Sequence, residues 1–511
     1  MYQNEYRFSC TMIRKLKICL LLLGFLILLI IMPARAEIIN SGTCGRDIDW
    51  TLDESGMLTI HGNGAMTNYS LGSSAPWYFQ RSSIKSVTIN NNVTTIGNHA
   101  FYNCTNLVNV IISDSVTNIG DNAFSNCSNI KNITIPDSVT NIGSNAFLAC
   151  SSITSITIPD SVTNIGSSAF NNCLNLTNVS ISNEATNIGD SAFRNCSSLT
   201  SITIPNSIIN IGNSAFRDCS NLISVTISNS ITRIGDYTFG NCSKLTNFII
   251  PDGVTSIGTY AFSNCSGLAN INIPNSVTFI GSYAFSDCSS LTSIIIPTSV
   301  TQMPGFLFYR CTGLANVTIL SDIPQIGMNT FYNCSSLTDI NIPNSVTSIY
   351  NSAFQGCSAL TNITIPESVT SIGDCAFEGC SSLISVYNLS GVSSIGNKAF
   401  QNCSSLTNIS LPLCVSSIGS EAFHNCSSLT SINIPMGVTI IDTGVFKECV
   451  NLASIDIPNS VKTIEYSAFS GCSSLTSVIL PKDITSIGGS AFANCSELTT
   501  ILIPNSITST L

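Results

Sequence analysis

Apolar and polar residues follow each other along most of this chain in a pattern that repeats every 23 residues. In the unit that begins at Cys127, the residues Ile130, Ile133 and Ile135 have the spacing L-x-x-I-x-I, with polar residues between them. The alternation at the end of this run predicts a short β-strand with one apolar and one polar face. Pro136 has no N–H group to donate to a neighbouring strand, so we expect the strand to end there.

The second half of the same unit returns apolar side chains to the interior. Val139 and Ile142 are expected to point inward after a turn, and Gly143 is expected to allow a backbone conformation that other residues resist. Ala146 and Phe147 are expected to fill the opposite side. One such turn has too few apolar residues for a closed core, whereas stacked turns bury them continuously.

The repeat keeps its register over most of the chain, which decides the fold class. Phenylalanine recurs from Phe101 to Phe492 in (492 − 101)/23 = 17 steps, and a cysteine follows each phenylalanine by three residues, as at Cys104 and Cys495. The first strand is predicted at 84–89 and the last at 498–503, so (498 − 84)/23 = 18 steps give about 19 strands. We therefore predict a horseshoe-like repeat solenoid with one parallel sheet of about 19 strands. A parallel β-helix is the alternative, but the single strand motif and the irregular A-F-x-x-C segment of each unit favour the horseshoe.

The repeated motif L-x-x-I-x-I-P-x-x-V-x-x-I-G-x-x-A-F-x-x-C resembles the BspA-type leucine-rich repeat of bacterial surface antigens, over residues 81–511. Residues 37–80, with Trp50 and Trp77, are similar to the N-terminal region of such proteins. We interpret them as a small β-rich cap whose two tryptophans cover the first exposed turn. The chain departs from the common leucine-rich consensus, because its cysteine precedes the strand leucine and Ser usually takes the slot after the strand. The resemblance implies a leucine-rich-repeat fold and an extracellular, adhesin-like or host-interacting role, which composition alone does not show.

Residues 1–36 have the pattern of a signal peptide. Arg14, Lys15 and Lys17 precede an apolar run at 18–32, and the following Pro-Ala-Arg-Ala predicts cleavage after Ala36. An uncleaved anchor is the alternative, but the run is shorter than the roughly 20 residues that span a membrane. We expect no membrane span after cleavage, and a secreted or cell-surface protein. The last unit lacks its phenylalanine, which predicts either a fragment or an edge that meets a partner.

The charge of the chain argues against nucleic acid as a partner. It has 18 Lys and Arg and 28 Asp and Glu, and the chain without residues 1–36 has a net charge of 13 − 27 = −14. Such a surface repels nucleic acid and anionic membranes. Charged residues make up only 9% of the sequence, so Ser, Thr and Asn supply most of the polar surface.

Cysteine and histidine are the residues that suggest chemistry, and neither forms a recognisable site. The 23 cysteines suggest disulfides in an exported protein, but most of them occupy one apolar-flanked position of the repeat, which favours buried thiols. No CxxC spacing predicts a metal site. The three histidines His61, His99 and His424 have no catalytic spacing, and no cofactor motif is present, so we expect neither an enzyme nor a cofactor.

The outward-facing residues of the predicted strands are the default binding surface of a solenoid. The chosen candidates are Lys131, Asn132, Thr134, Asn178, Asn247, Asn272, Asn341, Tyr387, Asn433 and Asp456. The irregular segment at 303–310, with Phe306, Tyr309 and Arg310, is either a specific contact patch or a tolerated defect. We predict binding of an extracellular protein or glycan, with weak single contacts that gain from repetition. A structural spacer without its own ligand is the alternative.

Overall fold

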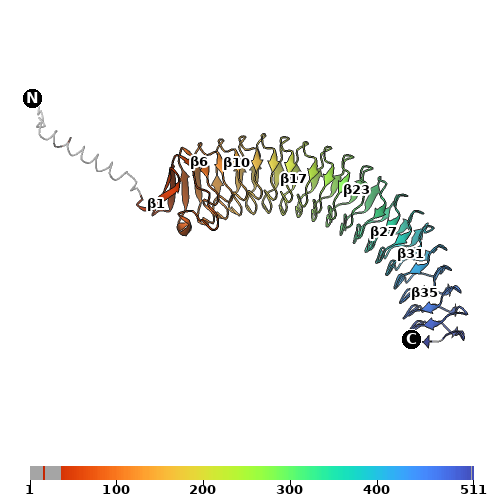
Figure 1. Ribbon diagram of the computed structural model, residues 1–511. Coiled ribbons are helices and arrows are strands. Elements are labelled where there is room, and N and C mark those ends of the chain that lie inside the picture. The colour runs from red at the N-terminus through yellow and green to blue at the C-terminus, as the bar shows by residue number, and fades with distance from the viewer. Residues whose placement is uncertain (1–14, 16, 18–35, 508, 511) are drawn as a thin grey trace, which may run out of the picture.

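The structure is a computed structural model, and it describes residues 15, 17, 36–507 and 509–510. The predicted signal peptide and its cleavage point therefore lie almost entirely outside the described residues. The described chain winds into a long curved solenoid, with its turns stacked side by side from the N-terminal to the C-terminal end (Figure 1). Within this part of the chain, there is no helix with the length and apolar character needed to cross a membrane.

A small β-rich unit starts the solenoid. Strands β1 (Ile38–Gly45), β2 (Ile48–Asp53) and β3 (Met57–Gly62) pair antiparallel, and β3 then pairs parallel with β5 (Ser86–Ile89), the first strand of the repeats. A single 3₁₀ turn, η1 (Tyr78–Gln80), lies between them in sequence. This unit joins the repeats without a break in the hydrogen-bonded sheet, so it continues their strand row.

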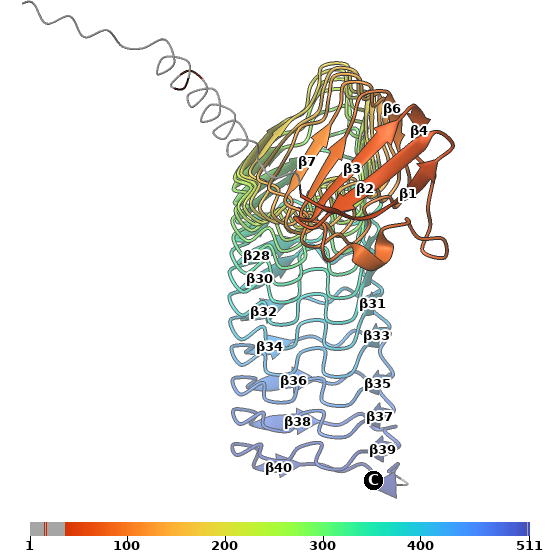
Figure 2. The ribbon, with the colours of Figure 1, turned by 90° about the vertical axis from the view of Figure 1, so that its left-hand side faces the viewer.

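Nearly every turn of the repeat contributes two short strands, which form two rows along the solenoid (Figure 2). The first strand row contains the strands that the I-x-I pattern predicts: β5, β7 (Asn109–Ile112), β9 (Asn132–Ile133), β11 (Ser155–Thr157), β13 (Asn178–Ser180), β15 (Ser201–Thr203), β17 (Ser224–Thr226), β19 (Asn247–Ile249), β21 (Asn270–Asn272), β23 (Ser293–Ile296), β24 (Asn316–Ile319), β26 (Asp339–Ile340), β28 (Asn362–Thr364), β30 (Ser385–Tyr387), β32 (Asn408–Ile409), β34 (Ser431–Ile432), β36 (Ser454–Asp456), β38 (Ser477–Ile479) and β40 (Thr500–Ile501).

The strands of the second row lie just before the position of each unit at which glycine usually recurs. Its members are β4 (Gly64–Ala65), β6 (Val93–Ile96), β8 (Asn118–Ile119), β10 (Asn141–Ile142), β12 (Asn164–Ile165), β14 (Asn187–Ile188), β16 (Asn210–Ile211), β18 (Arg233–Ile234), β20 (Ser256–Ile257), β22 (Phe279–Ile280), β25 (Gln325–Ile326), β27 (Ser348–Ile349), β29 (Ser371–Ile372), β31 (Ser394–Ile395), β33 (Ser417–Ile418), β35 (Ile440–Ile441), β37 (Thr463–Ile464), β39 (Ser486–Ile487) and β41 (Ser509–Thr510).

The predicted solenoid of 23-residue units with about 19 parallel strands is confirmed, although the hydrogen bonding divides these strands into shorter sheets. The first strand row has the expected number of strands, since (500 − 86)/23 = 18 steps separate β5 from β40. These strands belong to six separate hydrogen-bonded sheets, and those of the second row belong to four more. The sequence pattern missed the second row because it predicted a turn with inward Val and Ile there. The register that aligns one strand per turn also aligns every other extended segment with its copy in the next turn.

The second strand row is interrupted once, at the irregular segment noted in the sequence. In a regular turn, the N–H group at the glycine position donates to the isoleucine carbonyl of the preceding turn, as Gly281 does to Ile257 at 2.8 Å. Pro304 occupies this position one turn later and has no N–H group to donate. Residues 281–324 of the described chain accordingly carry no strand of the second row.

Glycine recurs at one position in most units because this position lies in close contact with the neighbouring turn, and not because its backbone conformation is unusual. Gly143 is not among the residues with positive φ. A Cβ atom at this position would lie 2.7 Å from the backbone nitrogen of Asp121 in the preceding turn. The expectation that Gly143 relieves a strained backbone is therefore wrong, because the glycine makes room for the neighbouring turn.

The core is a continuous stack of one phenylalanine per turn. Phe124 and Phe147 lie with ring centroids 5.4 Å apart and an interplanar angle of 3°, and the stack extends in the same way from Phe101 to Phe492. Trp77 extends the stack at its N-terminal end, 5.6 Å from Phe101. The indole N–H of Trp77 donates to the Ala100 carbonyl at 2.9 Å. Trp77 thus covers the first turn, as the sequence suggested, and Trp50 packs edge-on against it.

The cysteine ladder is buried beside this stack and is hydrogen-bonded across turns. The Cys127 thiol donates to the carbonyl of Phe101 at 3.0 Å, and Cys265 donates in the same way to Phe239 at 3.2 Å. Both side chains are fully buried. Burial raises the pKa of the Cys265 thiol to about 12. A small apolar residue with one weak donor therefore matches the position, which explains the repeated cysteine without redox or metal chemistry.

We expect the change Phe262→Ala to lower the free energy of unfolding of the surrounding turns by about 3–5 kcal/mol, because it opens a cavity between two stacked rings. The exposed Phe279 lies in the next turn but outside the stack, at 57% exposure. As a matched control, Phe279→Ser should change the stability by less than about 0.5 kcal/mol. Urea unfolding followed by circular dichroism measures both values, and equal losses would contradict the stack as the main source of stability.

We also expect maleimide to label the native chain at Cys414, which is exposed, before any ladder cysteine. The thiolate is the reacting species, and ladder thiols are both buried and protonated at pH 8. Mass spectrometry of native and urea-treated protein identifies the labelled positions. Cys414→Ser, which restores the residue that most units have there, should remove the fast native labelling. Rapid native labelling of Cys173 would show that the ladder is not buried as described.

The raised thiol pKa values further predict a loss of stability at high pH. Since the folded state holds its thiols protonated, their contribution is complete below the ordinary pKa of 9.0 and is lost as the pH rises towards about 12. Thermal unfolding measured across this range should show a falling Tm. A variant with Ala at Cys219, Cys265 and Cys380 should show a shallower fall, and an identical slope would rule out the thiols as its cause.

Candidate binding surfaces

The ten strand-face candidates are all exposed. They lie on or beside the first strand row, and they are Lys131, Asn132, Thr134, Asn178, Asn247, Asn272, Asn341, Tyr387, Asn433 and Asp456. Every strand of the first row begins with Ser, Asn, Asp or Thr, so this face presents hydrogen-bonding groups with little charge. The orientation expected from the alternating pattern is therefore correct, and a ligand for these residues stays a prediction.

Two of these candidates come together at an open hollow on the first strand row. Asn433 and Asp456 form a β-bridge between neighbouring turns and line a hollow of about 720 Å³. Leu413 and Met436 border the same hollow and are 80% and 79% exposed. The other candidates are spread along the solenoid, with Lys131, Asn132 and Thr134 together in one turn and Asn247 and Asn272 in adjacent turns.

The side chain of Asn433 already has a structural task in this hollow. Its amide nitrogen donates to the Leu411 carbonyl at 2.7 Å, and its amide oxygen accepts from the Leu411 N–H at 3.1 Å. The amide of Asn433 thus forms two hydrogen bonds with the backbone of the preceding turn, in place of hydrogen bonds between the two backbones. Asp456 offers the one carboxylate in the lining of the hollow.

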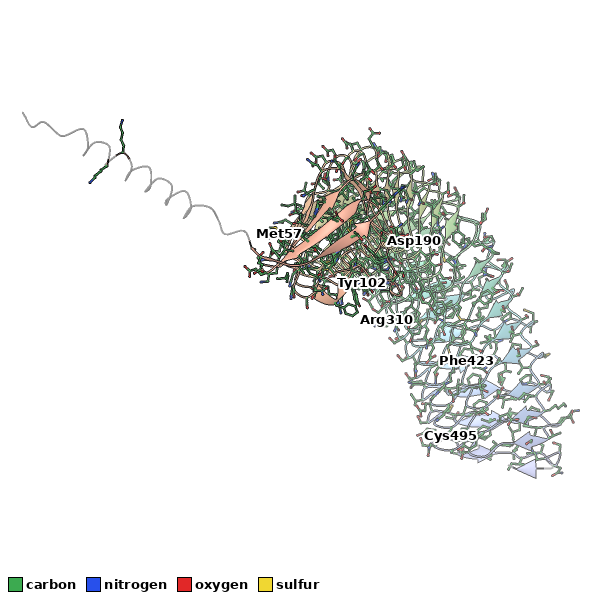
Figure 3. The ribbon with its side chains drawn as sticks, turned by 60° about the vertical axis from the view of Figure 1, so that its left-hand side comes forward. Met57, Tyr102, Asp190, Arg310, Phe423 and Cys495 are labelled. Carbon is green, nitrogen blue, oxygen red and sulfur yellow. The ribbon has the colours of Figure 1, made fainter. Side chains whose placement is uncertain are left out.

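A second candidate surface lies on the A-F-x-x-C segment, where Arg310 marks its position in Figure 3. Here six half-buried aromatic side chains from neighbouring turns contact each other in a continuous group, which we call the aromatic strip: Tyr237, Tyr260, Tyr283, Phe306, Tyr309 and Tyr332. The first four stack face to face, with centroid distances of 4.6, 4.5 and 4.4 Å. Tyr309 stacks on Tyr332 at 4.8 Å and meets Phe306 at 5.8 Å.

The repeat itself positions these rings. The first four members stand two residues before a core phenylalanine, and Tyr283, for example, has a φ of 59° at this site. Bulky residues rarely adopt this left-handed conformation, which costs roughly 1–2 kcal/mol. Gly240 lies beside Tyr237, since a Cβ atom there would be 3.6 Å from Cδ1 of that ring. Stacking between turns and the small neighbour together stabilise the unusual backbone.

Arginine–aspartate pairs stand at both ends of the strip. The guanidinium of Arg217 lies over the Tyr237 ring at 4.4 Å from its centroid, and its Nε is 3.6 Å from Asp218. At the other end, Arg310 Nε is 3.4 Å from Asp287. Partial burial raises the pKa of Asp287, and the positive charge of Arg310 opposes this rise.

The irregular segment in the sequence is thus one end of a larger cluster. The structure brings Phe306, Tyr309 and Arg310 together, and it adds Tyr283 and Tyr332, which the sequence reading did not select. A signal was available, because Tyr237, Tyr260 and Tyr283 are spaced 23 residues apart at one position of the repeat. A comparison of the same repeat position in successive units therefore identifies these three tyrosines from the sequence.

The histidines do not form a reactive cluster among the described residues. His424 Nδ1 lies 2.8 Å from the Gln401 amide nitrogen, and His424 Nε2 lies 3.7 Å from Glu448. His61 and His99 belong to the N-terminal turns. Across the described part of the chain, no three His, Cys, Asp or Glu side chains are placed to hold a metal ion together.

Comparison with known proteins agrees with this geometry. The model of the BspA type leucine rich repeat region matches residues 75–200, 163–292, 278–407 and 393–510. Among solved structures, a leucine-rich repeat protein from Bacteroides ovatus is 30% identical, with a TM-score of 0.56, and the match covers 77% of this chain and 94% of that one. A leucine rich cell surface protein from Faecalibacterium prausnitzii is 29% identical, with a TM-score of 0.41, and the match covers 69% of this chain and 95% of that one. No curated protein matches the chain.

The ranges that match the family cover the repeated units of this chain, which carry the stacked phenylalanine, the buried cysteine and both strand rows. The fold and family are typical of scaffolds that bind other molecules and not of enzymes. The matched ranges extend from residue 75 to residue 510, well over half of the chain. The chain therefore belongs to the BspA-type leucine-rich-repeat family.

Proposed function

We propose that this protein is exported, with cleavage after Ala36, and acts at the cell surface as a binding protein for an extracellular protein or glycan. The observation that carries the proposal is the first strand row, which presents exposed Ser, Asn and Thr side chains in nearly every turn of the solenoid. A surface of this kind forms many equivalent hydrogen bonds. It suits adhesion by repeated weak contacts better than capture of one small molecule.

Two further observations support this role. The family matched by the chain consists of leucine-rich repeats of the BspA type, and one of the similar solved structures is described as a cell surface protein. The chain has a net charge of −14 beyond residue 36, which disfavours nucleic acid as the ligand. The apolar border of the hollow at Asp456 adds a place where one contact is stronger than the rest.

The proposal predicts saturable binding of residues 37–511 to one class of immobilised extracellular-matrix protein or glycan. Affinity should fall when the number of repeats is halved, because fewer equivalent contacts act together. Surface plasmon resonance on a panel of matrix proteins and glycans measures both effects. The variant Asp456→Asn removes the carboxylate from the hollow with little change in the size of the side chain. The variant Lys482→Asn changes a charged residue outside the hollow and is its matched control.

The competing role is a structural spacer that holds another molecule away from the cell and has no ligand of its own. Folded, monomeric protein that binds no member of the panel would contradict the adhesin proposal and favour the spacer. Binding that is equal for full-length and shortened arrays would instead contradict the contribution of repetition.

A further inference from the structure

The aromatic strip has a composition that the strand face lacks. Its five tyrosines and one phenylalanine, with Arg217 and Arg310 at the ends, match the residue types that dominate binding energy at protein interfaces. All six rings are half-buried, so part of each ring stays accessible. The strand face carries one exposed tyrosine among the ten candidates, Tyr387.

Stacking decides which part of each ring a ligand meets. Tyr260 has Tyr237 on one face and Tyr283 on the other, and Tyr283 is enclosed in the same way by Tyr260 and Phe306. The accessible parts are therefore ring edges and phenol hydroxyls. The edge of an aromatic ring carries partial positive charge, so a row of edges attracts oxygen atoms and carboxylates.

The arginines at both ends are each paired with an aspartate and keep unused N–H donors. Arg310 Nε lies 3.4 Å from Asp287, and Arg217 Nε lies 3.6 Å from Asp218. Their terminal Nη groups make no hydrogen bond to another described residue. Carboxylates bind two guanidinium N–H groups at once, which makes them the matching group on a ligand.

The distribution of charge along the chain points to the same place. Between residues 190 and 332 the sequence has five basic and six acidic residues, a net charge of 5 − 6 = −1. The rest of the chain beyond residue 36 carries −14 − (−1) = −13. An acidic partner is repelled by most of the solenoid and meets much less repulsion at the strip.

A glycan is the less suitable occupant. Sugars bind aromatic side chains by packing their C–H groups on a ring face, and the faces of Tyr260 and Tyr283 are both filled by neighbouring rings. An extended protein segment has no such requirement. It can place side-chain carboxylates at the arginines and apolar groups between the ring edges.

We propose that the aromatic strip is a docking site for an acidic segment of a partner protein, on a surface separate from the first strand row. This inference rests on the proposed function and names one kind of partner for it. Tyr237, Tyr260 and Tyr283 form the contact surface, and Arg217 and Arg310 hold the carboxylates at its ends.

The test measures binding of a short fluorescein-labelled peptide of alternating glutamate and leucine to residues 37–511 by fluorescence anisotropy. The strip variant carries Ser at Tyr237, Tyr260 and Tyr283, because Ser214 and Ser352 occupy the same repeat position and backbone conformation. We expect its Kd to rise by about tenfold or more, since several hot-spot side chains are lost. Arg310→Asn, which restores the most frequent residue of its position, should also raise the Kd and reduce its dependence on salt.

Controls separate the strip from folding and from the strand face. Tyr466→Ser removes a tyrosine that is 59% exposed and lies outside both the strip and the first strand row, so it should leave the Kd unchanged. Circular dichroism verifies that each variant is folded. A lysine–leucine peptide and hyaluronan, an anionic glycan, complete the panel. Equal binding of the basic peptide, binding of hyaluronan alone, or no effect of the strip variant would overturn the proposal. A wild-type chain that binds a matrix ligand but not the acidic peptide overturns the strip proposal and leaves the proposed function standing.

Discussion

The packing of each phenylalanine ring on its copy in the next turn is the contact on which the rest of this solenoid depends. Phe170 and Phe193, for example, lie 5.4 Å apart and nearly parallel, and both are fully buried. Each buried ring contributes roughly 1.5–3 kcal/mol by removal from water. No single turn can bury its ring, because both faces need a neighbour. Stability is therefore a property of adjacent turns, and a change of register by one residue would affect both neighbours of a turn.

The same requirement governs the backbone around the ring. In the A-F-x-x-C segment, alternate N–H groups donate within the turn and to the next turn, as Ala146 does to Gly143 and Phe147 does to Ala169. This alternation needs left-handed residues on either side of the phenylalanine, which is why Asn is frequent two residues after it, as at Asn126 with a φ of 62°. The cysteine thiol then donates to the phenylalanine carbonyl of the preceding turn. A compact, hydrogen-bonded segment without regular secondary structure results.

With the interior fixed in this way, function is left to the positions that face outward. The first strand row keeps small polar residues in nearly every unit, which gives a long and uniform surface. The aromatic strip differs, because it is confined to a few turns and uses residues that are bulky for their backbone conformation. Consecutive turns carry these residues together, so that each ring stacks on the next and helps to stabilise its neighbour there. A local exception within a uniform array is a suitable place for specific recognition.

The sequence by itself determined the repeat length, the strands of the first row and the buried positions, because a period maintained over many units leaves few alternatives for which side chains face inward. It also placed Trp77 over the first turn and the ten strand-face candidates at the surface. Only the tertiary structure decided the second strand row, the division of both rows into shorter sheets and the reason for Gly143, since these depend on distances between turns. The aromatic strip is likewise a feature that only the tertiary structure decided. Tyr260 and Tyr283 are 23 residues apart in sequence, and only the stacking of turns brings their rings to 4.5 Å.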